Sequence, residues 1–366
     1  MAGITVTTIT ELVNTLTNQD YWNNDGGTIT VNPPNGVLDF NNEGYFYKQT
    51  PFLPLPVSTR YAAGLATTDK DVTIDFNNTK LTNIYVYPGN YFMQMDTGHR
   101  ANYTYNNTYT FLNGEFEAVL NDSIFLSFRN SKEYGSGDQL AYGTLIFKNC
   151  IFNIKITNSN CKDIFNINCG HSYFINCVFN IEYVNMTRDE QNNIGNSLIN
   201  NYSHRSFGYA VVEHYILSCE FRIRFRNGAL PGLLDHSNQN VRYHIIRFNN
   251  ESKYKEISDN VLFVNKYFTD SAYIGIVCDD AASTSNTKYN NNFVASFGSD
   301  DFNTKESLII GNCLSGAIGG TQLFYDNDKC GYTDYGTDST KVGLPTADCK
   351  NTDKLIEAGY IFASET

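Results

Sequence analysis

The amino-acid sequence predicts an all-β chain folded as a right-handed parallel β-helix, a solenoid in which consecutive coils stack along one axis. Three observations predict this class. A short motif, made of an apolar residue, a turn pair and a second apolar residue, recurs along the chain. Segments of alternating apolar and polar residues surround its copies, and a second set of apolar segments lies between them. Units of this kind cannot bury their apolar faces alone, so they are typical of stacked repeats.

The repeated motif predicts which residues stack on one another. Its copies span residues 76–81, 111–116, 147–152, 174–179 and 216–221, with a shorter copy at 310–314. Stacking in register would place one asparagine of each copy in a ladder of hydrogen-bonded side chains, beside a column of small residues. The predicted asparagine ladder consists of Asn78, Asn113, Asn149 and Asn176, and the small-residue column includes Cys150, Cys177 and Cys219.

The segments around the motif predict the strands of each coil. Residues 150–156 and 221–225 alternate with period two, which indicates strands with one buried face. The second set of apolar segments covers residues 91–95, 124–128, 164–168, 197–200, 232–235 and 261–264. One coil therefore takes roughly 30 to 40 residues and contains at least two strands.

The two ends of the chain differ from the repeats. Thr8 and Glu11 have the spacing of a capping box, and the apolar residues after Thr8 share one helical face, which predicts a helix over residues 9–17 that covers the first coil. After about residue 320 the pattern stops. We therefore expect a β-helix with an N-terminal cap over residues 1–320 and a small C-terminal cap or docking module over residues 321–366.

These features resemble the pectin-lyase-like superfamily of right-handed parallel β-helices. The resemblance covers roughly residues 4 to 320 and rests on the Phe-x-Asn-Cys-x-Phe motif at 147–152 and 174–179. The helix followed by Gly-Gly-Thr-Ile-Thr-Val at 26–31 is similar to the N-terminal cap of that superfamily. The resemblance implies the fold and leaves the activity open.

The composition narrows the function classes. The 366 residues include 41% hydrophobic and 14% aromatic residues, and the formal net charge is −12. Such a charge argues against nucleic-acid binding, because affinity for phosphates comes mostly from Lys and Arg. No apolar stretch is long enough to insert into a membrane, and the N-terminus has no pattern of a secretion signal. We therefore expect a protein made in a cytoplasm.

Glycan cleavage is one possible activity, because many enzymes of this superfamily cut acidic polysaccharides. The candidate catalytic carboxylates are two pairs of aspartates, Asp279 with Asp280 and Asp300 with Asp301. However, the motifs of polygalacturonase-like enzymes do not occur here in the required order, and the basic motif of pectate lyases is missing. The sequence therefore leans against an enzyme; if there is an activity, it would be that of a glycan-cleaving lyase or hydrolase.

The cysteines and histidines indicate neither a metal site nor a cofactor. The chain has nine cysteines without a C-x-x-C pair, and its histidines lack the spacing of a zinc site. The repeat-matched cysteines are expected to be free, buried thiols, although a disulfide between Cys150 and Cys177 on neighbouring coils stays open.

A loop rich in tyrosine and asparagine is a candidate for glycan contact. Tyr103, Tyr105 and Tyr109 alternate with polar residues, and such rings stack on sugars. The alternative is an extended loop whose rings pack on the neighbouring coil.

Taken together, the intact repeat and the incomplete catalytic motifs favour a structural virion protein. The chain resembles tail-spike, appendage and fibre proteins of tailed bacteriophages, which implies assembly in the host cytoplasm and a final place in the virion. Its expected partners are other virion proteins, further copies of itself, with a homotrimer favoured, and a host-surface glycan. A polysaccharide depolymerase and a carbohydrate-binding adhesin are the alternatives.

Overall fold

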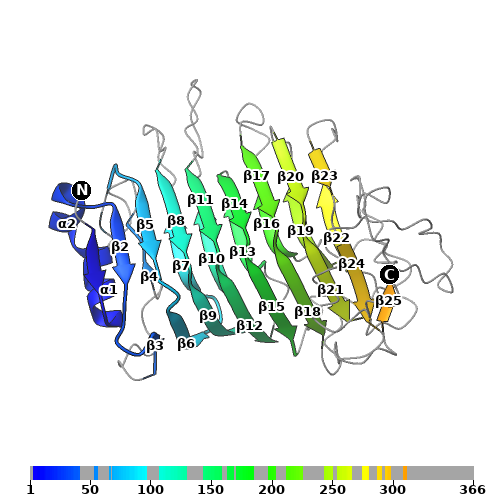
Figure 1. Cartoon of the computed structure of the whole chain (residues 1–366), viewed down its shortest axis with the longest axis horizontal. Helices are drawn as coiled ribbons and strands as arrows, with labels where there is room; N and C mark the ends of the chain where they lie inside the picture. The colour runs from blue at the N-terminus through cyan, green and yellow to red at the C-terminus, as the bar shows by residue number, and fades with distance from the viewer. Residues whose placement is uncertain are drawn as a thin grey trace, which may run out of the picture.

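A computed structural model describes parts of the chain between residues 3 and 310. The described residues are 3–41, 53–56, 66, 68–96, 107–129, 143–158, 163–168, 170–184, 197–202, 212–225, 243–249, 254–265, 274–279, 287–290, 293–297 and 308–310. They form two short helices and three sheets of stacked strands, which together make an elongated parallel β-helix (Figure 1). The all-β solenoid predicted from the repeats is confirmed.

The N-terminal cap is a pair of helices, α1 (Ile9–Thr17) and α2 (Gln19–Asn24). Thr8 caps α1, and its side-chain oxygen accepts a hydrogen bond from the backbone N–H of Glu11. The Glu11 carboxylate accepts from the backbone and hydroxyl of Thr7 at 2.7 and 2.9 Å, and a backbone hydrogen bond from Thr8 also contributes to the lowering of its pKa. The apolar face of α1 is buried, as is Trp22 of α2, so the predicted helix over 9–17 is confirmed.

Sheet A contains nine parallel strands along the body of the molecule. They are β1 (Ile4–Val6), β2 (Thr28–Val31), β5 (Val72–Asp75), β8 (Thr108–Leu112), β11 (Thr144–Lys148), β14 (His171–Ile175), β17 (Glu213–Leu217), β20 (Tyr254–Ser258) and β23 (Thr287–Asn290).

Sheet B also has nine strands, and all but the last are parallel. They are β3 (Val37–Asp39), β6 (Lys80–Val86), β9 (Glu115–Asn121), β12 (Ile151–Asn158), β15 (Val178–Tyr183), β18 (Glu220–Phe225), β21 (Val261–Asn265), β24 (Phe293–Phe297) and β25 (Leu308–Ile310). Because β25 runs antiparallel to β24, the motif copy proposed from residue 310 onward does not begin as another parallel coil.

Sheet C has seven parallel strands and completes each coil. They are β4 (Leu53–Pro54), β7 (Tyr91–Asp96), β10 (Ile124–Arg129), β13 (Phe165–Asn168), β16 (Ser197–Tyr202), β19 (Tyr243–Asn249) and β22 (Ile274–Asp279). A coil thus contributes three strands, one to each sheet. After the N-terminal cap, equivalent residues of successive coils lie between 27 and 47 positions apart, because the loops between the strands vary in length.

Stacked phenylalanines fill the interior. Along sheet B four rings stack with centroids 4.6 to 5.4 Å apart and planes within 20° of parallel. These rings belong to Phe116, Phe152, Phe179 and Phe221. A second stack in sheet A consists of Phe111, Phe147 and Phe174. From sheet C, Phe165 inserts its edge between the two stacks. The same aromatic residue on successive coils therefore holds the three sheets together.

The corner between sheets A and B is an asparagine turn. Asn113, Asn149 and Asn176 all have φ between 52° and 55°, a left-handed conformation that asparagine tolerates better than most residues. The Asn149 amide donates to the Asn113 side chain at 3.1 Å, and the Asn176 amide donates to the Asn149 side chain at 2.9 Å. These three members of the predicted asparagine ladder are confirmed.

The fourth predicted member of the ladder, Asn78, takes another role. It has a left-handed backbone, and its backbone N–H donates to the Asn113 carbonyl at 2.8 Å. The side chain that continues the ladder is that of Asp75, which accepts from the Asn113 amide at 3.0 Å. The reason is an insertion: Asp75 pairs with Leu112, and Lys80 with Glu115, so this turn holds two more residues than the next.

Residues 321–366, predicted as a C-terminal module, lie outside the described residues. Among the described helices, neither is long and apolar enough to cross a membrane.

Candidate functional surface

The outer face of sheet A carries a row of aromatic rings. Tyr173 on β14 and Tyr215 on β17 are paired in the sheet, and their rings stack with centroids 4.7 Å apart and planes 9° from parallel. Tyr254 on β20 extends the row, with its centroid 5.5 Å from that of Tyr215. The three side chains are partly exposed, because each strand alternates buried and outward residues. Since Tyr173 and Tyr215 cover one another's facing surfaces, this pair presents ring edges and hydroxyl groups, while the Tyr254 ring is tilted by 42°.

Two glutamates lie among these rings. The Tyr215 hydroxyl donates to Glu213 Oε2 at 3.4 Å, and the Tyr254 hydroxyl donates to Glu256 Oε2 at 3.0 Å. Burial, followed by the negative charge of Glu213, raises the pKa of Tyr215 to about 12. The Tyr215 hydroxyl is therefore a hydrogen-bond donor at neutral pH.

His171 borders the same row at the start of β14. Its Nδ1 accepts a hydrogen bond from the backbone N–H of Glu213 at 3.1 Å, which in the neutral ring places the hydrogen on Nε2. These outward residues of β14, β17 and β20 are together called the tyrosine face, which consists of His171, Tyr173, Glu213, Tyr215, Tyr254 and Glu256. It combines carboxylate and phenol oxygens, which can accept from sugar hydroxyls, with aromatic edges, groups that suit an uncharged, hydroxyl-rich ligand such as a glycan.

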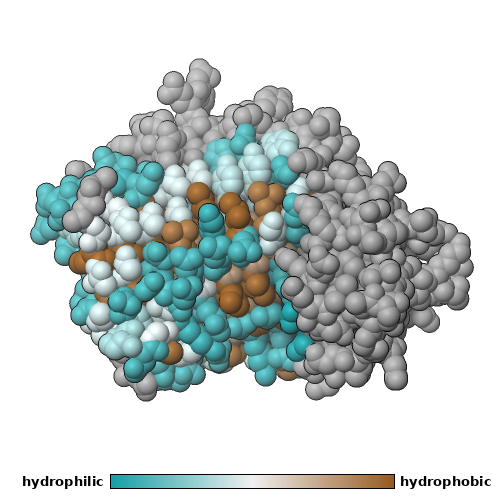
Figure 2. Space-filling model, in the orientation of Figure 1, coloured by the Kyte–Doolittle hydropathy of each residue, from teal (hydrophilic) through white to brown (hydrophobic). Residues whose placement is uncertain are grey.

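Apolar side chains continue the surface beside the tyrosine face. One outward row of sheet A contains the half-buried Leu112, Ile175 and Leu217, with the exposed Lys148 between Leu112 and Ile175. Figure 2 shows hydrophobic residues reaching the surface in the middle of the face in view, with hydrophilic residues around them. The outer surface of the coils is thus mixed in character.

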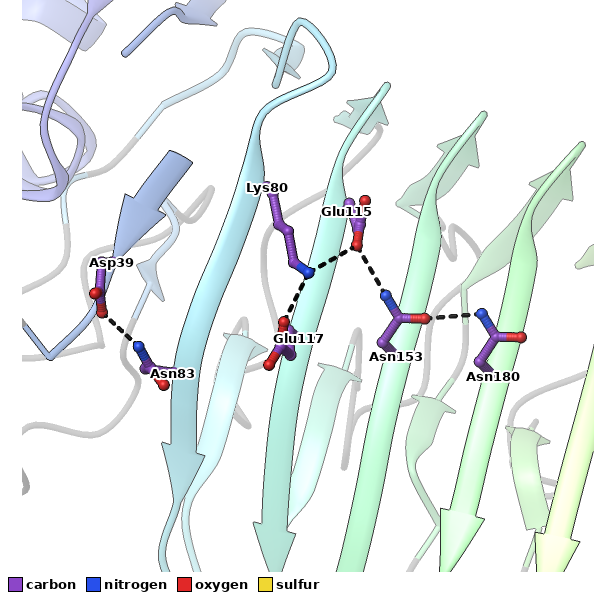
Figure 3. A network of polar contacts seen from close by, with 7 residues as sticks. All are labelled: Asp39, Lys80, Asn83, Glu115, Glu117, Asn153 and Asn180. Atoms are coloured by element: carbon purple, nitrogen blue, oxygen red, sulfur yellow. Dashed lines mark hydrogen bonds and ion pairs between the residues drawn. The ribbon is translucent and has the colours of Figure 1, made fainter. Parts of the chain in front are cut away.

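The outer face of sheet B is polar instead (Figure 3). Lys80 on β6 bridges Glu115 at 3.3 Å and Glu117 at 2.8 Å, both on β9. Glu115 also accepts from the Asn153 amide of β12, and Asn153 accepts from the Asn180 amide of β15. Hydrogen bonds to both glutamates raise the pKa of Lys80. This second ladder ties four strands together across the surface. Beside it, Asn83 donates to Asp39 at 2.8 Å.

A carboxylate next to sheet C is buried and accepts several hydrogen bonds. Asp163, just before β13, accepts hydrogen bonds from the backbone and hydroxyl of Ser197 at 3.0 and 3.1 Å and from the Asn200 amide. Burial raises the pKa of Asp163, while these donors and the charge of Arg247 oppose the increase. With its oxygens bonded to β16, Asp163 joins one coil to the next, which explains its position without catalysis.

The predicted glycan-contact residues are not an exposed loop as far as the structure describes them. Tyr109 belongs to β8, is 3% exposed, and donates its hydroxyl to the Pro56 carbonyl at 2.9 Å. Burial raises the pKa of this phenol. Tyr109 is thus an interior residue, and its assignment to glycan contact was wrong. Tyr103 and Tyr105 lie outside the described residues.

Of the four predicted catalytic aspartates, Asp279 alone belongs to the described part of the chain. Asp279 is the last residue of β22 and pairs with Phe248 of β19. Asp280, Asp300 and Asp301 lie outside the described residues. A catalytic role for these four residues stays a prediction.

The predicted small-residue column exists and contains free thiols. Cys150, Cys177 and Cys219 are buried and not joined in disulfides. Each sulfur lies 3.4 to 3.5 Å from two backbone carbonyl oxygens. Burial raises the pKa of Cys150 and of Cys177, so both thiols stay protonated and unreactive.

The described residues contain no group of three or more His, Cys, Asp or Glu side chains that could hold a metal ion.

The tyrosine face was not found from the sequence. Tyr173 and Tyr215 lie 42 positions apart, and only the register of β14 against β17 brings them together. The signal available in the sequence was the alternation of apolar and polar residues within each strand. It buries Phe174 and Ile216 and therefore places Tyr173 and Tyr215 on the outer face.

Comparisons with protein-family models, with curated proteins and with solved structures found no match for this chain.

Proposed function

We propose that this chain is a structural component of a tailed-bacteriophage particle, such as a spike, fibre or appendage, in which the β-helix serves assembly and host-surface contact. The observation that carries the proposal is the continuity of the side-chain stacks. Backbone pairing joins the coils in three sheets, and the phenylalanine stacks and asparagine ladder follow the same axis. A body held in this way resists bending, which is the property that a projecting virion part needs.

The outer surface supports the same proposal. The sheet B ladder and the tyrosine face each extend over several neighbouring strands along the axis, so they can offer contacts to a partner that lies along the coils. The partners would be other virion proteins, further copies of this chain in a homotrimer, and a host-surface glycan. Assembly would take place in the host cytoplasm.

Immunogold electron microscopy tests this proposal. Antibodies raised against the purified chain are applied to particles from the source of the sequence, with the same serum depleted on the purified chain as control. We expect gold on tailed particles at their projecting parts. Label confined to cell material, with bare particles in the same field, would count against a virion protein.

Glycan binding is the second candidate function, because the tyrosine face offers carboxylate and phenol oxygens as acceptors for sugar hydroxyls beside aromatic ring edges. We expect purified protein to bind surface polysaccharides on a glycan array, and Tyr215→Ala to lose that binding. Tyr85→Ala is the matched control, because Tyr85 is an outward tyrosine on sheet B. Equal binding by wild type and Tyr215→Ala would remove the tyrosine face as the binding site.

A further inference from the structure

The interior of the β-helix contains a polar cluster between sheets A and C. Ser172 on β14 and His214 on β17 are paired in one inward-facing column of sheet A. Asn201 on β16 meets them from sheet C. The three side chains are between 0% and 2% exposed, so they are isolated from bulk solvent. We call these three residues the interior polar cluster.

The Ser172 hydroxyl is the centre of this cluster. Its Oγ lies 2.8 Å from His214 Nδ1 and 3.0 Å from Asn201 Oδ1. A hydroxyl has one hydrogen and can donate to only one of these atoms. If it donates to Asn201, the His214 hydrogen sits on Nδ1 and Nε2 is an acceptor. If it donates to His214, Nε2 carries the hydrogen and is a donor.

Two polar atoms of the cluster have no hydrogen-bond partner within the protein. They are Nε2 of His214 and Nδ2 of Asn201, and both are buried. A buried polar atom that has lost water and found no replacement is unfavourable. The ring of Phe248, with its centroid 5.5 Å from that of His214, offers no strong partner.

Two other interior polar groups, by contrast, bond to the protein. The Tyr109 hydroxyl, in the column that leads to Ser172, donates to the Pro56 carbonyl. Asn260 is 0% exposed, yet its amide donates to the Ile216 carbonyl at 2.9 Å and its oxygen accepts from the Cys219 N–H at 2.8 Å. The interior polar cluster therefore differs from its surroundings.

We infer that the interior polar cluster is a binding site for at least one water molecule, held by His214 Nε2 and Asn201 Nδ2. Buried water is the usual partner of polar groups that the protein leaves unsatisfied, and it makes about three hydrogen bonds. Water can accept from the Asn201 amide and can donate to or accept from His214, so it fits either tautomer. Ser172, Asn201 and neutral His214 carry no charge, which favours a neutral ligand, whereas buried Lys255, paired with His214 on the next strand, carries a positive charge, so the test below distinguishes water from an anion.

A high-resolution crystal structure of the full chain tests this inference directly. We expect a peak of electron density at about 2.8 to 3.0 Å from His214 Nε2 or Asn201 Nδ2, without an anomalous signal after a bromide soak. A peak that becomes anomalous with bromide would identify an anion and overturn the proposal of water. A cluster with no peak, whose two atoms bond to protein groups, would overturn the site itself.

Magnetic relaxation dispersion of water deuterons gives a test in solution, because it detects water molecules that stay inside a protein. The wild-type protein should show a dispersion that weakens in His214→Phe, which removes Nε2. Tyr109→Phe is the matched control, since it removes an interior hydroxyl that already has a protein partner. An unchanged dispersion in folded His214→Phe would contradict the inference, and the crystallographic test stands even if that variant does not fold.

Discussion

Gly114 occupies the column in which the following coils have cysteine. A Cβ added at Gly114 would lie 2.8 Å from Cδ2 of Phe76 and 3.0 Å from the ring of Phe116. Phe76 comes from the two-residue insertion in the turn below, and its ring packs edge-on against Phe116 at 5.1 Å. Position 114 is therefore glycine because the Phe76 ring, brought there by the insertion, occupies the space that the cysteine side chain fills in the following coils.

Gly114→Ala should destabilise the protein by about 1 to 3 kcal/mol, because overpacking forces rings from their positions. The measurement is urea unfolding of the variant, of Phe76→Leu and of the double variant. We expect the double variant to be about as stable as Phe76→Leu alone, since the shorter side chain makes room for the methyl group. If the losses of stability in Gly114→Ala and Phe76→Leu simply added in the double variant, the Phe76 ring would not be the reason that position 114 requires glycine.

His214 gives the molecule a pH dependence. Burial, followed by the charge of Lys255, lowers the pKa of His214 from 6.5 to about 3. Between about pH 6.5 and pH 3, His214 is therefore protonated in the unfolded chain and neutral in the folded chain. This contribution to stability is complete above pH 6.5 and is lost as the pH falls towards 3.

Because of His214, we expect the free energy of unfolding to be lower at pH 4 than at neutral pH by on the order of 3 kcal/mol. The check is the urea midpoint between pH 7 and pH 4 for wild type, His214→Leu and the control His171→Gln. His214→Leu should have a flatter pH profile, whereas His171→Gln should follow the wild type, because its amide oxygen can still accept from Glu213. Parallel profiles for wild type and His214→Leu would refute this origin.

At the scale of the elements, the asparagine turn has two separable functions. Asn149 needs a left-handed backbone with φ of 55°, and its side chain links the turns below and above. Glycine keeps the first function and loses the second, whereas alanine loses both.

Asn149→Gly should therefore cost about 1 kcal/mol, and Asn149→Ala about 2 kcal/mol or more. Thermal unfolding of the two variants measures the difference, and each serves as the other's control. Equal losses would mean that the hydrogen-bonded ladder, and not the backbone conformation, accounts for the whole effect. If Asn149→Ala were as stable as the wild type, neither the left-handed backbone nor the side-chain ladder at Asn149 would contribute to stability.

The elements that repeat strictly could be predicted from the sequence, and those that depend on loop length could not. Asn113, Asn149 and Asn176 were placed correctly because their turns have equal length. Asn78 was not, because the inserted Phe76 and Asn77 move its side chain out of the ladder. Tyr109 was assigned to a loop because its polar neighbours hide the alternation that buries it in β8. The tyrosine face depends on a register between strands 42 residues apart.

At the scale of the whole molecule, the interior changes along the axis. Stacked phenylalanines fill the coils from β9 to β18. From the coil of β17 onward, the buried residues also include His214, Lys255 and Asn260, which introduce polar contacts into the interior. In a solenoid each coil is stabilised mainly by its two neighbours, so such a change affects local stability and does not average out.

Amide hydrogen exchange followed by mass spectrometry should therefore show the slowest exchange in β12 and β15 and faster exchange in β20. Phe152 is central to the slow region, because its ring stacks on Phe116 at 5.4 Å and on Phe179 at 5.0 Å. Phe152→Leu should speed exchange in β9, β12 and β15 while leaving β2 and β20 close to the wild type, since coupling passes through neighbouring coils. Leu12→Ala in the cap is the matched control, with its effect confined to the first coils. A uniform increase along the chain in Phe152→Leu would show that the β-helix unfolds as one unit and that the coils are not independently stabilised.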